Sequence, residues 1–243
     1  MFFCACFFLL LLLVVPAVSA AAPGDTVGVF RQGVFYLKNS NSAGNADLVF
    51  PYGAASDTPL VGDWTGQGMD TVGVFRQGVF YLRNSNSAGN ADMAFPYGAA
   101  TDKPLVGDWT GQGKDTVGVF RQGMFYLKNS NSAGNADLVF PYGAASDTPL
   151  VGDWTGQGMD TVGVFRQGVF YLRNSNSAGN ADTVFAYGAA TDIPVVWYHN
   201  GMDTVGVFRQ GVFYLRNSNS AGNADLVFPY GAASDIPLMG EWI

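Results

Sequence analysis

The aspartates of a recurring glycine-rich segment are the residues whose type and spacing could do chemistry. In the segment GDWTGQGMD, Asp63 and Asp70 stand on either side of two glycines. Carboxylates spaced along a short loop can bind a hard cation such as Ca²⁺, and a carboxylate pair can also serve as general acid and base. Because the pair recurs, we favour a structural or binding role over catalysis, which needs one singular site. The candidate cation ligands are Asp63, Asp70, Asp108, Asp115, Asp153 and Asp160.

A tryptophan follows the first aspartate of each copy, and it has two interpretations. Buried, it packs one repeat against the next, because aromatic side chains contribute large areas to a core. Exposed, it could stack on a sugar ring while the neighbouring carboxylate accepts hydrogen bonds from sugar hydroxyls. The residues of this second interpretation are Asp63, Trp64, Asp108, Trp109, Asp153 and Trp154.

The polar segment NSNSAGNAD is the most uniform feature of the chain. Its Asn and Ser side chains are neutral donors and acceptors suited to polyols or glycans, and repeated loops would provide multivalent binding. Recent duplication would make every position equally uniform, so the repetition alone does not identify a ligand surface. The segment begins at Asn39, Asn84, Asn129, Asn174 and Asn217. The candidate ligand-binding residues are Asn84, Asn86, Asn90, Asn129, Asn131 and Asn135.

Catalysis and nucleic-acid binding find little support in the composition. The single histidine, His199, lies in the one degenerate copy of the glycine-rich segment, and no HExxH or CxxC motif occurs. The formal net charge is −7, without a run of Lys or Arg, which argues against a nucleic-acid or anionic-membrane partner. We therefore predict that the protein is not an enzyme.

Self-similarity organises the whole chain. The string DTVGVFRQG begins five times, near residues 25, 70, 115, 160 and 203, so the period is about 45 residues. Each repeat holds four short apolar runs rich in Val, Phe, Tyr and Leu, as strands prefer. In the second copy these runs are Pro59 to Trp64, Thr71 to Arg76, Val79 to Arg83 and Asp92 to Gly98. Only Gln77 and Gly78 separate the second run from the third, which predicts a tight hairpin.

Four antiparallel strands every 45 residues predict an all-β, five-bladed β-propeller. The chain opens with the second run of a repeat, at Thr26, and closes with a first run, Pro237 to Ile243. We therefore expect the carboxy-terminal run to supply the inner strand of the blade that residues 25–53 begin, which would close the ring and remove exposed sheet edges. A linear stack of four-stranded units is the alternative.

Residues 1–20 are predicted to be a secretory signal peptide, with the propeller spanning residues 21–243. Phe2 to Val15 is an unbroken apolar run, shorter than a membrane-spanning helix needs, and small residues lead to a cleavage position after Ala20. Both cysteines, Cys4 and Cys6, lie in this segment. The mature chain would therefore be secreted and free of disulfides, and no membrane partner would remain after cleavage. An uncleaved amino-terminal anchor is the alternative.

The string GDWTGQGMDTVGVFR resembles the FG-GAP or VCBS-like class of propeller repeats, which includes the blades of integrin α-subunit heads and of some fungal lectins. The resemblance covers all five copies and implies a calcium site of DxDGDG type between the first two strands. This chain departs from that pattern at Thr65 and Gln67, which replace two carboxylates, so calcium binding should be weak. No other cofactor is implied.

These observations predict a secreted, non-catalytic binding or adhesion module. Multivalent recognition of a carbohydrate is the leading hypothesis, with a glycan or an extracellular, cell-surface protein as the partner. The alternatives are a structural surface or matrix protein without a small ligand, and a weak calcium-binding repeat protein. Neither the ligand nor the oligomeric state follows from the sequence.

Overall fold

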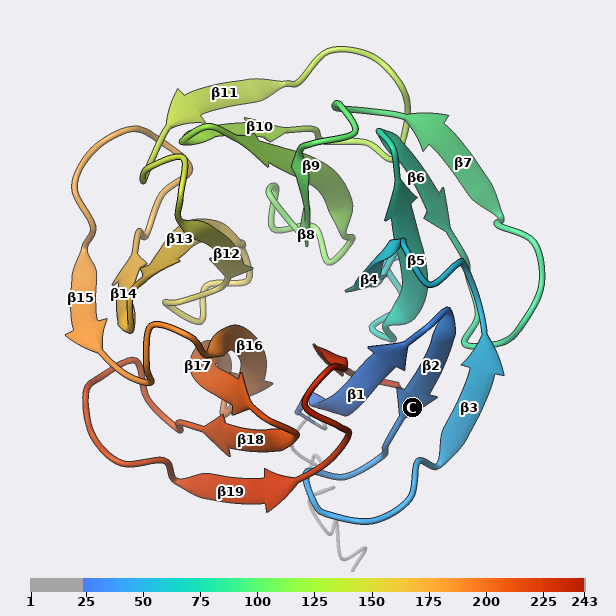
Figure 1. Ribbon diagram of the computed structural model, residues 1–243. Helices are drawn as coiled ribbons and strands as arrows, with labels where there is room; N and C mark the ends of the chain where they lie inside the picture. The colour runs from blue at the N-terminus through green and yellow to red at the C-terminus, as the bar shows by residue number, and fades with distance from the viewer. Residues whose placement is uncertain (1–23, 243) are drawn as a thin grey trace, which may run out of the picture.

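The computed structural model describes residues 24–242, which form a ring of five four-stranded antiparallel sheets around a central axis (Figure 1). The five-bladed propeller and its all-β class are confirmed, and no described residue is helical. The predicted signal peptide, residues 1–20, lies outside the described residues. None of the described residues forms a helix long and apolar enough to cross a membrane.

The blades follow the repeats, and in each of them the innermost strand is given first. Blade 1 consists of β20 (Ile236–Gly240), β1 (Thr26–Arg31), β2 (Val34–Leu37) and β3 (Leu48–Pro51). Blade 2 consists of β4 (Thr58–Gly62), β5 (Thr71–Arg76), β6 (Val79–Leu82) and β7 (Met93–Pro96). Blade 3 consists of β8 (Lys103–Gly107), β9 (Thr116–Arg121), β10 (Met124–Leu127) and β11 (Leu138–Pro141). Blade 4 consists of β12 (Thr148–Gly152), β13 (Thr161–Arg166), β14 (Val169–Leu172) and β15 (Thr183–Ala186). Blade 5 consists of β16 (Ile193–His199), β17 (Met202–Arg209), β18 (Val212–Leu215) and β19 (Leu226–Pro229).

The two ends of the chain meet in blade 1. Strand β20 pairs with β1 in antiparallel register, with Thr26 opposite Gly240 and Phe30 opposite Ile236. Figure 1 shows the red carboxy-terminal strand beside the blue first strand at the centre of the ring. The predicted closure of the ring is therefore confirmed. Backbone pairing of sequence-distant strands satisfies amides that would otherwise be left on an open edge.

The hairpin between the second and third strands of a blade is a two-residue turn with both central residues at positive φ. In blade 2, Arg76 pairs with Val79 across Gln77 (φ 49°) and Gly78 (φ 85°). This is the backbone twist that suits a two-residue β-hairpin. The glycine was expected there, whereas a glutamine in the left-handed region is uncommon.

Blade 5 departs from the others because its first connection is a hairpin rather than a glycine-rich loop. Asn200 (φ 52°) and Gly201 (φ 89°) join β16 directly to β17, with His199 opposite Met202. The Asn-Gly pair is a strong hairpin signal in any sequence. The copy that is two residues shorter in sequence thus keeps its strand pairing and extends it.

The core lies between blades, in five equivalent clusters. Between blades 2 and 3, for example, Trp64 and Phe80 pack with Val117 and Val119 of β9. Within a blade, Phe80 stacks on Phe95 with ring centroids 5.8 Å apart. Because each cluster draws on two blades, every blade depends on its neighbours for burial, and the ring holds its loops in fixed mutual positions.

Candidate functional site

The first aspartate of each glycine-rich loop organises its own loop. The Asp63 carboxylate accepts hydrogen bonds from the backbone N–H groups of Thr65 (3.1 Å), Gly66 (2.7 Å) and Gly68 (2.5 Å), and from the Thr65 hydroxyl. Asp108 and Asp153 accept the equivalent bonds from Thr110, Gly113, Thr155 and Gly158. Burial raises the pKa of Asp63, but the N–H groups of Gly68, Gln67, Gly66 and Thr65 outweigh it and hold the pKa below its usual value.

The second aspartate of each loop ties one blade to the next. Asp115 Oδ2 accepts the backbone N–H of Asp63 at 2.8 Å, and the Asp115 N–H donates to the Asp63 carbonyl at 2.9 Å. The same two-point contact joins every pair of neighbouring blades. Its acceptors, which we name the aspartate ring, are Asp25, Asp70, Asp115, Asp160 and Asp203.

The predicted calcium ligands therefore do not converge on a common point. Asp63 faces the N–H donors of its own loop, while Asp70 Oδ2 accepts the N–H of Glu241 in blade 1 at 2.9 Å. A cation at Asp63 would meet amide protons instead of further oxygens, which is the wrong polarity for a hard cation. Among residues 24–242, no group of three or more His, Cys, Asp or Glu side chains is arranged to hold a metal ion. The glycine-rich loops do not fit the calcium site that the resemblance implies.

The carboxyl groups of the aspartate ring have raised pKa values. Burial is the main cause that raises the pKa of Asp70 to about 7, of Asp160 to about 8 and of Asp203 to about 6. Burial, and repulsion from neighbours in the ring, hold the pKa of Asp25 and Asp115 well above the usual range. Desolvation and like charges both favour the neutral carboxyl. This ring bears on the stability of the fold as a whole.

The tryptophans lie in the core, which corrects their assignment as ligand-binding residues. Trp64 is 1% exposed, Trp109 6% and Trp154 7%. The indole of Trp64 lies against two glycine backbones, because a Cβ at Gly62 or Gly73 would stand 3.0 or 3.3 Å from its ring. A buried indole offers no face to a sugar, so only the packing interpretation agrees with the structure.

The NSNSAGNAD loops are held by their own side chains. Asn86 Nδ2 donates to the carbonyl of Asp70 at 2.8 Å, and the N–H of Asn84 donates to Asp92 at 2.7 Å. Asn131 and Asn129 make the same contacts with Asp115 and Asp137. Asn86 and Asn131 thus fix their loops to the residues that precede β5 and β9, and the exposed side chains of Asn84 and Asn129 make no hydrogen bond of their own to any described residue.

The last asparagine of this loop has a different position, because it lines a pocket between two blades. Asn90 lies in a pocket of about 270 Å³ between blades 1 and 2, and Asn135 in one of about 240 Å³ between blades 2 and 3. Equivalent pockets of about 390 and 260 Å³ lie between blades 4 and 5 and between blades 5 and 1. We call these four the interblade pockets. Of the predicted loop residues, only Asn90 and Asn135 reach them.

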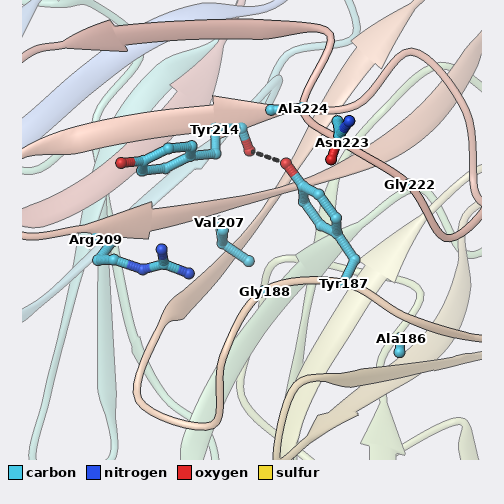
Figure 2. A pocket seen from close by; sticks show the side chains of 9 residues that line it. All are labelled: Ala186, Tyr187, Gly188, Val207, Arg209, Tyr214, Gly222, Asn223 and Ala224. Carbon is cyan, nitrogen blue, oxygen red and sulfur yellow. Dashed lines mark hydrogen bonds between the residues drawn. The ribbon is translucent and has the colours of Figure 1, made fainter.

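The interblade pocket between blades 4 and 5 shows the shared construction (Figure 2). Tyr187 and Gly188, which follow β15, form one wall, and Arg209 of β17 with Tyr214 of β18 forms the other. Asn223 and its neighbours in the NSNSAGNAD loop complete the rim. The Tyr187 hydroxyl donates to the Tyr214 carbonyl across the blade boundary at 3.1 Å, as drawn in Figure 2.

Each wall residue is positioned by its own local contacts. A Cβ at Gly188, which has φ +83°, would come within 2.8 Å of Val207 and 2.9 Å of Asp192, so only glycine lets the two blades approach this closely. Burial raises the pKa of Tyr187 to about 12, which keeps its hydroxyl protonated. The guanidinium of Arg209 lies over the Tyr214 ring, 5.2 Å from its centroid.

The sequence patterns pointed to the loop asparagines but not to the tyrosine that follows the outer strand. The signal was the Tyr-Gly pair that ends each fourth run. At the fifth interface, between blades 3 and 4, Tyr142 likewise donates to the Tyr171 carbonyl at 3.2 Å, and Arg166 lies 5.1 Å from the Tyr171 ring centroid. The same tyrosines and arginine occur at all five interfaces, but the hydroxyl bond is missing between blades 1 and 2, where the Tyr52 hydroxyl has no partner among the described residues.

Comparison with known proteins adds only a general likeness of shape. No protein-family model matches the chain, and no curated protein sequence matches it. Among solved structures, the chain is similar to one described as an Agrocybe aegerita lectin that specifically recognises non-reducing terminal N-acetylglucosamine, with 17% identity and a TM-score of 0.46 over 76% of this chain and 57% of that one. It is also similar to BBS1N in complex with ARL6DN, with 11% identity and a TM-score of 0.41 over 72% and 57% of the two chains. The chain spans little more than half the length of either structure, and likeness at this level carries no argument about ligands.

Proposed function

We propose that this propeller is a secreted, non-catalytic binding module that recognises glycans multivalently in its interblade pockets. The observation that carries the proposal is the recurrence of one set of side chains, two tyrosines, an arginine and an asparagine, around pockets at four blade interfaces. A rigid ring that presents several equivalent weak sites gains avidity without better contacts at any one of them.

The chemistry of the pockets suits a hydroxylated ligand. Arg209 presents N–H donors, Asn223 presents an amide that can donate and accept, and the Tyr187 oxygen keeps acceptor capacity. The volumes, about 240 to 390 Å³, lie near the small end of ligand pockets and fit a terminal sugar unit better than a long segment. Secretion, adhesion and an FG-GAP or VCBS-like relationship belong to this proposal through the sequence patterns described above.

The absence of catalysis is part of the same proposal. The sole histidine, His199, stacks on Trp197 with ring centroids 4.5 Å apart and contacts Asn200 through Nε2. It lines none of the four interblade pockets. A repeated set of neutral and ion-paired groups favours binding over a reaction that needs one activated centre.

A glycan array with the mature chain, residues 21–243, tests the proposal. The informative variant replaces by Ala the four pocket asparagines, Asn45, Asn90, Asn135 and Asn223, together with Asn180 at the same loop position. These exposed side chains make no hydrogen bonds within residues 24–242, so the fold should be retained. We expect array binding to fall at least about tenfold, since small losses of about 1 kcal/mol per site compound in a multivalent interaction.

The matched control replaces the five asparagines that begin the loops, Asn39, Asn84, Asn129, Asn174 and Asn217, by Ala. These side chains lie in the same loops but line none of the four pockets, so binding should persist. Equal loss in both variants would move the site from the pockets to the loop surface. No binding by the wild-type chain to any glycan would overturn the proposed function and favour a structural surface protein.

A further inference from the structure

The arginine that lines each interblade pocket is paired with a buried aspartate behind the pocket wall. In the pocket between blades 4 and 5, Arg209 donates from Nε and Nη2 to the two carboxylate oxygens of Asp192 at 2.7 and 2.6 Å. The Asp192 side chain is 0% exposed, whereas that of Arg209 is 45% exposed. The pocket therefore meets the outer edge of a guanidinium whose positive charge is already paired in a bidentate geometry.

The second cation near this pocket is also committed. Arg216 lies 5.9 Å from the centroid of the Tyr187 ring, but its Nη1 is 3.1 Å from Asp225 and donates to the carbonyl of Asn223. The side chain of Arg216 is only 10% exposed, so a ligand in the pocket would not meet an unpaired guanidinium there. Beyond the pocket, the formal net charge of the chain is −7.

The nitrogen donors that remain free in this pocket carry no uncompensated charge, because Asp192 compensates the charge of Arg209. Nη1 of Arg209 and the side-chain amide of Asn223 make no hydrogen bond within the described residues, so both can face a ligand. Arginine sites that select carboxylates or phosphates present an unpaired guanidinium fork to the anion. Here the fork already holds Asp192, so an incoming anion would face a negative neighbour behind the one remaining nitrogen.

Resting on the proposed function, we infer that the interblade pockets select uncharged sugar residues and reject sialylated, sulfated and uronic-acid termini. The buried aspartate behind each arginine is the specificity-determining group. It fixes the guanidinium as a directional donor to hydroxyl or carbonyl oxygens and removes its attraction for anions. The aspartates of the four pockets are Asp57, Asp102, Asp192 and Asp235. Asp147 pairs with Arg166 in the same way at the interface between blades 3 and 4.

An array that carries matched glycans with and without a terminal anionic group tests the inference. We expect binding to the neutral member of each pair, and a change of less than about twofold between low and high salt, because no net charge is being screened. Preferential binding to the anionic members would overturn the inference while leaving the proposed function in place. Binding to neither member of any pair would remove the proposed function itself.

The variant Asp192→Asn gives the test a second, independent readout. Asn can still accept the N–H of Ala189 through its side-chain oxygen, but the positive charge of Arg209 is no longer cancelled. We expect a gain of binding to a monovalent sulfated monosaccharide, about fivefold and with a stoichiometry of one per chain, because only one pocket is altered. The melting temperature identifies a variant that has not folded.

Glu241→Gln is the control, because it changes the net charge by the same amount at a residue that lines none of the interblade pockets. It should leave anion binding unchanged. If the folded Asp192→Asn variant gains no anion binding, or if Glu241→Gln gains as much, the assigned role of Asp192 is wrong.

Discussion

Individual side chains divide the work in this protein between holding blades together and leaving the pockets open. Asp63 serves the loop that contains it, Asp70 serves the neighbouring blade, and Asp57 neutralises the arginine of a pocket. Three aspartates of one repeat therefore have three separate tasks, although the sequence shows only that all three are repeated. Their spacing along the glycine-rich segment had placed Asp63 and Asp70 among the candidate cation ligands.

One residue in each repeat stands in a backbone conformation that its side chain does not favour. Gln122 has φ +50° in the hairpin between β9 and β10. Asparagine visits this region more readily than glutamine. We expect Gln122→Asn to raise the free energy of unfolding by about 0.5 kcal/mol, measured by chemical denaturation.

Gln112→Asn is the matched control, because Gln112 lies in the glycine-rich loop and has no positive φ. It should leave the unfolding free energy within about 0.3 kcal/mol of the wild type. An equal gain from both substitutions would show that the backbone conformation is not the cause.

At the scale of elements, the NSNSAGNAD loops have identical sequences but unequal anchors. Arg83 donates from Nε to the Ser87 carbonyl (2.7 Å), and from its terminal nitrogens to the carbonyls of Ala88 (2.8 Å) and Asn90 (2.5 Å). In blade 3 the equivalent residue is Lys128, which donates only to the Asn135 carbonyl at 3.2 Å. Gly89 leaves room for the Arg83 guanidinium, since a Cβ there would stand 2.7 Å from it.

We therefore expect Lys128→Arg to stabilise the protein by about 1 kcal/mol and to slow amide hydrogen exchange in residues 129–137. The reciprocal substitution Arg83→Lys should destabilise by a similar amount and accelerate exchange in residues 84–92. Two substitutions with effects of the same sign would contradict the account, because it attributes the difference to the number of donors alone.

The elements show what the sequence could and could not predict. Strand positions and the tight hairpin followed from apolar runs and the Gln-Gly step, because both are local. The Asn-Gly hairpin at Asn200 is equally local, but the sequence pattern was interpreted as a degenerate copy of the glycine-rich loop. The pockets could not be predicted, since Tyr187 and Arg209 belong to different repeats and become neighbours only when two blades pack together.

At the scale of the whole molecule, two sets of aspartates oppose each other as the pH changes. In the aspartate ring, burial raises the folded pKa above the unfolded value of 3.8, to about 7 for Asp70, about 8 for Asp160 and about 6 for Asp203. Such groups stabilise the fold when protonated, and this stability is lost as the pH rises through the folded pKa. Neighbouring charged groups that face the ring are Asp63, Asp108, Asp153 and Glu241.

The aspartates paired with pocket arginines behave in the opposite way. Burial raises the pKa of Asp57, Asp102, Asp147 and Asp192, but the hydrogen bonds from Arg and from a backbone N–H outweigh it and lower the pKa overall. Their contribution is present above a pH of about 4 and is lost as the pH falls. The fold should consequently be most stable in mildly acidic solution.

We expect the free energy of unfolding to fall by a few kcal/mol between about pH 5 and about pH 8, as measured by chemical denaturation at both values. Asp160→Asn should reduce this difference, because the amide still accepts the N–H of Asp108 but cannot ionise as the pH rises. Stability that rises over the same interval would show that the ring is not held in its neutral form.

The pairing of β20 with β1 has a consequence for how such a ring can grow. The ring closes when an inner strand from one end of the chain pairs with the three outer strands from the other end. This division of one blade between the two ends does not depend on the number of repeats between them. Gain or loss of one full 45-residue unit by unequal recombination would change the circumference without disturbing the seam. Blade number is thus a quantity that evolution can alter in whole steps, each adding or removing one interblade boundary.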